Sequence, residues 1–315
     1  MKNDKVSVLL PIRNGEKYIS DLRNSIEINI EANDEVVIIN DGSTDGTLHL
    51  LKDWASQNSQ VNLIDTNGIG LVAALNLGLK QSSNEWIARF DVDDVYKNNR
   101  IQEQKKLISD KNVAIFCDYS LMTENLRKIG TLPTAIFKEA VSLSLISSQR
   151  TPHPGVLFNR SAVIDVGGYR EQDFPAEDLS LWLRLSRIGN LVSVPKVLLE
   201  YRISRNSISG SRRSSALEKK NQLLEKFSIN LSDYEYCRDN WQYLFRSYDN
   251  AELSAERKYL LIFDLFKASK HLGLRLDCKF EMLEKGILDI DAFKGVFNLS
   301  KTKTLKMLNR LNLFP

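Results

Sequence analysis

Strand-like and helical sequence patterns alternate along the first two thirds of this chain. Residues 6–11 and 35–40 are apolar runs typical of buried strands, and the intervening segment 17–31 has an apolar residue at every fourth position from Tyr18. Strand and helix follow one another in steps of about 25 to 30 residues, which is the pattern of βαβ units. We therefore expect an α/β fold with a mostly parallel central sheet.

The same alternation continues beyond these units. We expect further strands at 61–64, 85–90, 113–119, 155–158 and 198–201, and helices at 44–56, 71–80, 100–109 and 135–148 and within 175–189. Segment 204–215 is rich in Ser and Arg, which is typical of a loop or linker, and the pattern beyond it is helical. We therefore place a boundary near residue 212, between an α/β domain at 1–212 and a helical C-terminal extension at 213–315.

Charge balance and cysteine spacing exclude several classes of protein. The 43 Lys and Arg against 40 Asp and Glu give a formal net charge of +3, too small to indicate nucleic-acid binding. The three cysteines are far apart, which argues against a disulfide framework or zinc site and favours a reducing compartment. The amino terminus runs directly into the first expected strand, and no apolar run approaches the roughly 18 residues of a membrane span, so we expect a cytoplasmic protein.

Three carboxylates lie within four residues, Asp91-Val92-Asp93-Asp94, directly after the expected strand at 85–90. Such a cluster repels itself unless a cation balances it. At the carboxyl end of a strand, where open α/β sheets bind ligands, the expected cation is Mg²⁺ or Mn²⁺ held jointly by carboxylates and ligand phosphates. A solvated acidic turn is the alternative interpretation.

Two common phosphate-binding loops are absent from the sequence. The turn after the first strand is Pro11-Ile12-Arg13-Asn14-Gly15, which is not GxGxxG, and the P-loop pattern GxxxxGK[ST] does not occur. If a nucleotide binds, its phosphates need another partner, and a metal on Asp91 and Asp93 is the candidate.

Five segments of the chain, in this order and spacing, resemble glycosyltransferase family 2. They are residues 6–14, 37–47, 70–78, 91–94 and 176–182. The resemblance covers roughly the first two thirds of the chain. It implies a GT-A nucleotide-diphospho-sugar transferase fold, a nucleotide-sugar donor, a divalent metal and inversion at the anomeric carbon. Within the family the chain looks most like bacterial enzymes that build O-antigen, capsule or related surface glycans.

The resemblance assigns roles around the donor. Asp93 corresponds to the direct metal ligand, and Asp91 lies beside the ribose or shares the metal. Asp41 is similar to the aspartate that binds the nucleobase, commonly uracil, although it could instead cap the helix expected at 44–56. Pro11, Arg13 and Asn14 are expected at the same mouth, though many relatives have Tyr where this chain has Arg13.

Arg202 lies in Tyr201-Arg202-Ile203-Ser204, which resembles a Tyr-Arg-x-His motif of many relatives with Ser204 in place of His. Arg202 could pair with the diphosphate as a bidentate donor. If that histidine is a metal ligand in the relatives, this chain has lost it.

The acceptor side of the site is expected at Glu177 and Asp178. Inverting transfer requires a base that deprotonates the acceptor hydroxyl. Asp178 resembles the family base, and Glu177 would orient it or contact the acceptor; an acidic pair that complements a helix dipole is the alternative. His153, between two prolines, is expected near the acceptor or the metal, or else packs in a loop.

The C-terminal segment has a basic and apolar pattern. After Asp291 it has no acidic residue, and Lys and Arg interleave with Leu and Phe between 301 and 314. A helix of this pattern suits an anionic membrane surface, and a plain solvated helix is the alternative. Because the family's acceptors are often polyprenyl-diphosphate lipids, peripheral contact with the inner membrane would fit.

The leading hypothesis is an inverting, metal-dependent glycosyltransferase that moves a hexose or N-acetylhexosamine from a UDP-sugar to a lipid-linked bacterial glycan. Two other classes stay open. A sugar nucleotidyltransferase would use the same sheet and metal, but residues 11–15 lack the Gly- and Lys/Arg-rich loop usual in such enzymes. A non-catalytic GT-A-like binding module is kept open by the missing histidine.

Overall fold

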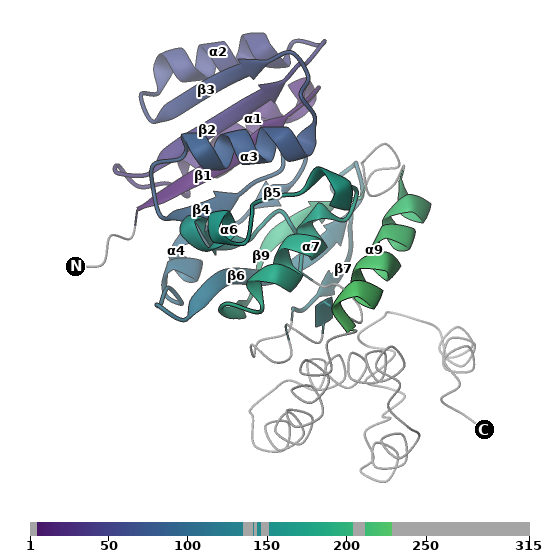
Figure 1. Ribbon diagram of the computed structural model, residues 1–315. Coiled ribbons are helices and arrows are strands. Elements are labelled where there is room, and N and C mark those ends of the chain that lie inside the picture. The colour runs from purple at the N-terminus through teal and green to yellow at the C-terminus, as the bar shows by residue number, and fades with distance from the viewer. Residues whose placement is uncertain (1–4, 135–140, 142–143, 146–150, 204–211, 229–315) are drawn as a thin grey trace.

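The amino-terminal half of the sheet is parallel. The computed structural model describes residues 5–134, 141, 144–145, 151–203 and 212–228. The first strands are β1 Val6–Ile12, β2 Glu35–Asp41, β3 Val61–Thr66 and β4 Trp86–Arg89. The elements between them are η1 Glu16–Tyr18, α1 Ile19–Glu27, α2 Thr47–Gln57 and α3 Leu71–Gln81. Since β1 pairs in parallel with β2 and β4, and β2 with β3, these strands all end at the same edge (Figure 1).

The second half of the sheet mixes strand directions. Its strands are β5 Val95–Tyr96, β6 Asn112–Met122, β7 Lys128–Leu132, β8 Leu157–Asn159 and β9 Asn190–Arg202. Its helices are α4 Arg100–Lys105, α6 Arg160–Asp165, η2 Glu171–Asp173, α7 Glu177–Leu185 and α9 Arg213–Ser228. The strand order is β3-β2-β1-β4-β8-β6-β9-β5, with β7 paired to β6. β8 runs antiparallel to both β4 and β6, whereas β6 and β9 are parallel.

Helices cover both faces of the sheet, because the central strands are apolar on both faces. Residues of α3, α6, α7 and α9 pack over one face, which includes Leu9 and Phe158. Residues of α1, α2 and α4 pack over the other, which includes Leu10 and Ile38. The α/β fold with a mostly parallel sheet, expected from the sequence, is therefore confirmed.

Some element bounds differ from those expected. β7 and α6 were not expected, and β9 begins at Asn190 rather than at 198. The earlier part of β9 contains Pro195, and its pairing with β6 shifts register between the partners Val194 and Val197. Such an irregularity accommodates a proline that cannot donate a ladder hydrogen bond, and it breaks the apolar run that predicts a strand.

Parts of the expected organisation lie outside the described residues. These are most of the helix expected at 135–148 and the whole chain beyond 228, including the basic C-terminal segment. α9 begins at Arg213, and its Leu223 and Leu224 join the core cluster under α7. The division into two domains near residue 212 stays a prediction. Within the described ranges, no helix has the length and apolar character needed to cross a membrane.

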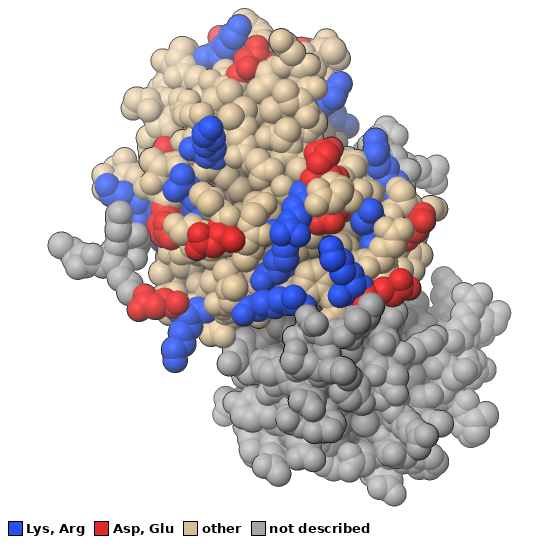
Figure 2. Space-filling view, in the orientation of Figure 1, with Lys and Arg blue, Asp and Glu red and all other residues tan. Residues whose placement is uncertain are grey.

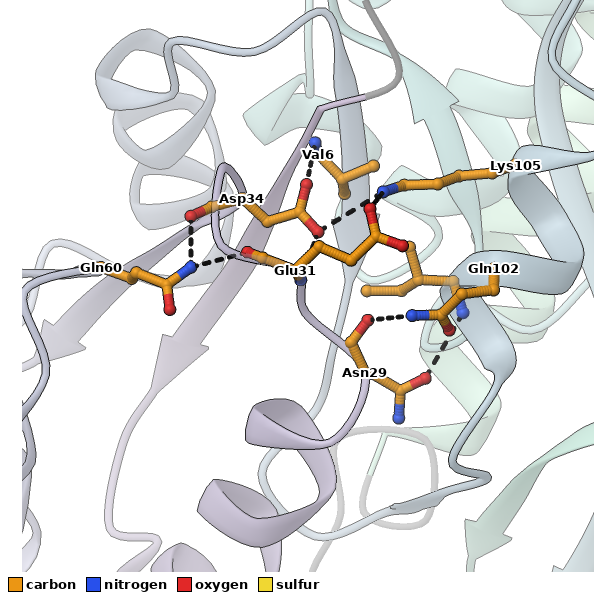
Figure 3. A network of polar contacts seen from close by, with 8 residues as sticks. Val6, Asn29, Glu31, Asp34, Gln60, Gln102 and Lys105 are labelled. Carbon is orange, nitrogen blue, oxygen red and sulfur yellow. Dashed lines mark hydrogen bonds and ion pairs between the residues drawn. The ribbon is translucent and has the colours of Figure 1, made fainter.

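The buried carboxylate of Asp34 binds groups at the edge of the sheet where the parallel strands begin (Figure 3). Asp34, 4% exposed, lies between α1 and β2, and its Oδ1 accepts from the Val6 N–H at 2.7 Å. Its Oδ2 accepts from the Glu31 N–H at 2.9 Å and lies 3.5 Å from Lys105 Nζ. The Gln60 amide donates to the carbonyls of Glu31 and Asp34, both at 2.8 Å. One turn therefore joins β1, α4 and the start of β3.

Replacing Asp34 by Ala should destabilise the fold by about 2–3 kcal/mol, because two backbone N–H groups lose their acceptor in a buried place. The free energy of urea unfolding measures the loss. The control is Glu31→Ala, which removes an ion pair to Lys105 from a side chain that is 59% exposed and should cost less than about 1 kcal/mol. Equal losses in the two variants would contradict this account of the turn.

Candidate functional site

The carboxyl edge of the parallel strands holds a large cavity. Its volume is about 940 Å³. Residues that line it come from the end of β1, the end of β2, the start of α3, the loop after β4 and the start of α7. Open α/β sheets bind their ligands at this edge.

All ten site residues expected from the sequence line this one cavity. They are Pro11, Arg13, Asn14, Asp41, Asp91, Asp93, His153, Glu177, Asp178 and Arg202. Their individual roles stay predictions, but the fold brings together six stretches of the chain that are far apart in sequence.

Asp91 is held by a buried arginine. The Arg89 side chain, 1% exposed, donates from Nη2 to Asp91 Oδ1 at 2.6 Å. The Tyr96 hydroxyl accepts from the Asp91 N–H at 2.6 Å. Burial, with Asp94 and Asp91 nearby, raises the pKa of Tyr96 well above its usual value, so this phenol stays neutral. Both the carboxylate and the backbone of Asp91 are thus fixed.

Arg202 joins the end of β9 to the acidic loop. Its backbone N–H donates to Asp94 Oδ1 at 2.7 Å, and its Nε donates to the Asp93 carbonyl at 2.5 Å. Its Nη1 donates to the Glu124 carbonyl at 2.6 Å. The guanidinium expected to pair with a diphosphate is therefore already bound to two backbone carbonyls, and its observed role is to shape the loop that carries Asp93.

The negative charge of the loop at 91–94 is only partly compensated by the described positive residues. Burial raises the pKa of Asp93 to about 6, and repulsion from Asp91 adds to the shift. Burial, then Asp93, raises the pKa of Asp94 well above its usual value, and among the described residues Asp94 Oδ2 has no hydrogen-bond partner. A carboxylate cluster in this condition fits a divalent cation.

The donor set also indicates how such a cation would be held. Within the described residues no group of three or more His, Cys, Asp or Glu side chains is arranged to hold a metal. Because Arg89 already binds Asp91 Oδ1, Asp93 is the better candidate ligand. A site of one or two carboxylates completed by phosphate and water oxygens is the usual arrangement for Mg²⁺.

Asp41 does not cap α2. Its Oδ1 accepts from the Ile69 N–H at 2.6 Å and its Oδ2 accepts from the Gly70 N–H at 3.1 Å, directly before α3. The carboxylate that binds the start of α2 is instead that of Asp45, just before the N-cap residue Gly46; its Oδ1 accepts from the Thr47 N–H at 3.1 Å. The alternative interpretation of Asp41 as the cap of the helix at 44–56 is therefore wrong, and Asp41 instead fixes the turn that forms one wall of the cavity.

The turn after β1 is fastened to the turn after β2. Asn14 has a left-handed backbone, with φ of 55°, which Asn tolerates better than most residues. Its Oδ1 accepts from the Thr44 N–H at 2.8 Å, and its own N–H donates to Ser43 Oγ at 3.0 Å. Asn14 is thus occupied in holding the turn, whereas Arg13 is exposed at the mouth of the cavity.

Glu177 and Asp178 open α7 with different protonation behaviour. Burial, followed by repulsion from Asp178, raises the pKa of Glu177 to about 8. Burial raises the pKa of Asp178 to about 6, against hydrogen bonds such as that from the Leu179 N–H to its Oδ1 at 2.6 Å. Near neutral pH the pair therefore carries one negative charge, mainly on Asp178. Glu177 is 6% exposed, and among the described residues its Oε2 has no partner.

His153 is neutral and packed. Its Nε2 lies 2.8 Å from the Tyr169 hydroxyl, and its ring centre lies 6.0 Å from that of Trp182 in an edge arrangement. Burial, then the charge of Arg89, lowers the pKa of His153 well below its usual value. The imidazole packs in its loop and also lines the cavity, and its place near the acceptor or the metal stays a prediction.

Several residues of the cavity were not expected from the sequence. Arg212 lines it and lies 4.9 Å from the centre of the Phe174 ring, and Lys17, Tyr18 and Thr151 line it as well. The Ser- and Arg-rich composition of 204–215 was the available signal for Arg212, but it is equally typical of a linker. Lys17 and Tyr18 looked like the first turn of an amphipathic helix.

Comparison with known proteins matches the chain to a family. The model of the family described as "Glycosyl transferase family 2" matches residues 7–166. A relative from Escherichia coli, named as a UDP-Gal:alpha-D-GlcNAc-diphosphoundecaprenol beta-1,3-galactosyltransferase, is 30% identical over 214 residues. That match covers 64% of this chain and 76% of the relative.

Two solved structures share the fold. Staphylococcus aureus TarS 1-349, solved in complex with UDP-GlcNAc, has a TM-score of 0.61 at 18% identity and covers 93% of this chain and 90% of its own. The mannosyltransferase PcManGT from Pyrobaculum calidifontis, solved with GDP-Man and Mn²⁺, has a TM-score of 0.57 at 14% identity, with 98% and 84% coverage. The GT-A fold expected from the sequence is confirmed by these neighbours.

Replacing Glu177 by Gln should raise the melting temperature at pH 8 and leave it nearly unchanged at pH 5. The pKa of Glu177 is raised from 4.5 to about 8. Its contribution to stability is therefore present below pH 4.5 and is lost as the pH rises toward 8, where the folded state must ionise a buried group. A neutral amide avoids that loss, and each kcal/mol regained corresponds to about 2–4 °C in a protein of this size.

Thermal melting across this pH range measures the effect. Glu171→Gln is the matched control, because Glu171 lines the same cavity but is exposed, and its substitution should not change the pH dependence. A lower melting temperature for Glu177→Gln at every pH would contradict the assignment of a buried, protonated carboxyl group.

Proposed function

The chain belongs to glycosyl transferase family 2, and we propose that it is an inverting, metal-dependent member that transfers a hexose or N-acetylhexosamine from a UDP-sugar to a bacterial surface glycan. The observation that supports this most is that Asp91 and Asp93 line the same cavity as Glu177 and Asp178. Burial raises the pKa values of both residues of the second pair, and the charge of Asp91 adds to both shifts. An inverting transfer needs both a site for the leaving diphosphate and a base for the acceptor hydroxyl, on opposite sides of the anomeric carbon within one cavity.

Asp178 is the proposed base. It is the member of the pair that is ionised at neutral pH, and the hydrogen bond from Leu179 N–H fixes one of its oxygens. It would take the proton from the acceptor hydroxyl as that oxygen attacks the anomeric carbon, on the face opposite the leaving diphosphate. Glu177, protonated beside it, keeps a second negative charge out of the buried end of the cavity.

The donor is proposed to lie along the ends of β1, β2 and β4. Asp93, with Asp91 beside it, would hold Mn²⁺ or Mg²⁺, which neutralises charge on the diphosphate as the sugar leaves. Arg13 at the mouth would contact the phosphates, and Asp41, which lines the same cavity, would lie beside the nucleobase. The TarS complex with UDP-GlcNAc and the PcManGT complex with Mn²⁺ support a nucleotide sugar and a metal in this fold.

The acceptor is proposed to be a polyprenyl-diphosphate-linked glycan. The Escherichia coli relative, whose name specifies a UDP-Gal donor and a diphosphoundecaprenol-linked acceptor, supports both choices. With such an acceptor, the enzyme would work in peripheral contact with the cytoplasmic face of the inner membrane. The three widely spaced cysteines agree with a reducing compartment.

Asp93→Asn should abolish the effect of Mn²⁺ on nucleotide binding. In the parental protein UDP with Mn²⁺ should raise the melting temperature more than UDP alone, because a ligand that binds the folded state stabilises it. The variant should lose this increment, and donor hydrolysis over a panel of UDP-sugars should fall by on the order of 10²-fold. Asp53→Asn, on the exposed surface of α2, is the control. If Mn²⁺ raised the melting temperature of Asp93→Asn with UDP as much as it does that of the parental protein, Asp93 would not be a metal ligand.

Asp178→Asn should lower kcat for transfer by on the order of 10²- to 10⁴-fold while UDP still raises the melting temperature as in the parental protein. The parental kcat/KM should also fall below about pH 6, because a base must be ionised and the pKa of Asp178 is raised to about 6. Glu171→Gln should keep parental transfer. Near-parental kcat in Asp178→Asn would exclude it as the base.

The same assays decide between the proposal and its alternatives. Release of pyrophosphate from a nucleoside triphosphate and a sugar phosphate would support a nucleotidyltransferase instead. Nucleotide binding without turnover across the panel of donors and acceptors would support a non-catalytic binding module.

A further inference from the structure

The connection between β6 and β7, together with the first two residues of β7, forms a hairpin tip, residues 123–129. The tip is closed by hydrogen bonds from the Thr123 N–H to the Arg127 carbonyl at 2.9 Å and from the Leu126 N–H to the Thr123 carbonyl at 3.0 Å. Residues 124–129 are all exposed. This is a short, closed turn, so its side chains have defined positions on the surface.

Leu126 occupies an unfavourable position in this tip. Its φ is 59°, in the left-handed region that leucine rarely adopts, and its side chain is 57% exposed. Glycine or asparagine would be accommodated there with less strain and without an exposed apolar surface. A leucine that costs backbone strain and gains no burial in the folded protein points to an interaction outside it.

The surroundings of Leu126 contain exposed apolar side chains and two basic residues against one acidic residue, Glu124. Ile129 is 50% exposed, and Ile203, whose N–H donates to the Met122 carbonyl at the base of the tip, is 45% exposed. Arg127 and Lys128 lie between Leu126 and Ile129. Lys and Arg side chains also gather over the face that carries α7 (Figure 2), so positive charge alone does not distinguish the tip. The combination of positive charge with exposed Leu and Ile side chains distinguishes the hairpin tip from the rest of this surface.

The hairpin tip is attached to the cavity. Leu121 and Glu124 line the cavity, and the Glu124 carbonyl accepts from Arg202 Nη1 at 2.6 Å. The same Arg202 side chain binds the Asp93 carbonyl. Whatever the tip contacts is therefore held at a fixed place beside the mouth of the cavity.

We propose that the hairpin tip docks on an anionic phospholipid membrane, with Leu126 and Ile129 in the interface and Arg127 and Lys128 on the lipid phosphates, and so holds the mouth of the cavity at the bilayer surface. Exposed aliphatic side chains flanked by Lys and Arg are the combination that binds such interfaces. The placement of the cavity mouth at the bilayer rests on the proposed function, because a lipid-linked acceptor has to reach the cavity from the membrane.

Binding of the full chain to vesicles tests the proposal without any assay of transfer. Vesicles of equimolar phosphatidylglycerol and phosphatidylcholine are compared with vesicles of phosphatidylcholine alone in flotation experiments. Leu126→Asn should weaken the partition coefficient on the anionic vesicles about tenfold, which corresponds to about 1.4 kcal/mol. The double variant Arg127→Gln with Lys128→Gln should weaken it about fivefold for each charge removed.

Folding and a matched site serve as controls. Leu126→Asn should melt at or above the parental temperature, because asparagine tolerates the left-handed backbone. Ile28→Asn is the matched control, because Ile28 is 50% exposed at the end of α1, outside the hairpin tip, and its substitution should leave vesicle binding unchanged.

Three outcomes would overturn the proposal. They are no binding of the parental protein to anionic vesicles, parental binding by Leu126→Asn, and self-association in gel filtration that Leu126→Asn abolishes without any effect on vesicles. Donor hydrolysis without vesicles should be parental in the tip variants. Tip-dependent vesicle binding by a protein that hydrolyses no UDP-sugar would support the docking and refute the proposed function, and the reverse result would refute the docking alone.

Discussion

The buried guanidinium of Arg89 is the interaction on which the arrangement of the site depends. It ends β4 and binds Asp91 Oδ1 at 2.6 Å, and its charge lowers the pKa values of Asp93, Asp94 and Glu177 against the effect of burial. Without this cation, three carboxylates would lie together in a partly desolvated place. Removing one member of a buried ion pair commonly costs about 3–5 kcal/mol, because the other charge is left uncompensated. The acidic motif at 91–94 is therefore stable at this place because Arg89, at the end of β4, supplies a buried positive charge next to it.

The change of strand direction at β8 brings the rest of the site to Arg89. The Arg89 N–H donates to the Val156 carbonyl at 2.9 Å, and the Gly155 N–H donates to the Arg89 carbonyl at 3.2 Å. Gly155 has a φ of 91°, which a residue with a Cβ rarely adopts. Buried side chains of α4 hold the same stretch, since Arg100 Nη2 donates to the Val156 carbonyl and Gln104 Nε2 to the Gly155 carbonyl. His153, just before this stretch, is thereby set against the wall formed by α7.

Most of the fold was predictable from local patterns, and the exceptions have physical reasons. The parallel strands are apolar on both faces, so their runs stand out. β9 was only partly recognised, because Pro195 and a register shift interrupt its pattern, and β7 was missed because none of its residues is buried, so it has no apolar run. The candidate site residues were recognised by residue type and by their position after strands, and all ten line one cavity. Arg212 was missed, because its contact with Phe174 joins segments that no local pattern connects.

By itself, the sequence determined the alternation of strands and helices, the edge of the sheet where ligands bind and the residues of the two acidic motifs. These follow from the spacing of apolar side chains and from carboxylates placed directly after strands, which are local properties. Only the tertiary structure decided that Asp41 caps the turn before α3, that Arg202 binds the loop of Asp93, and that Glu177 keeps its proton to a higher pH than Asp178. Hydrogen-bond partners and pKa values depend on burial and on distances between groups far apart in the chain, and the fold alone sets those.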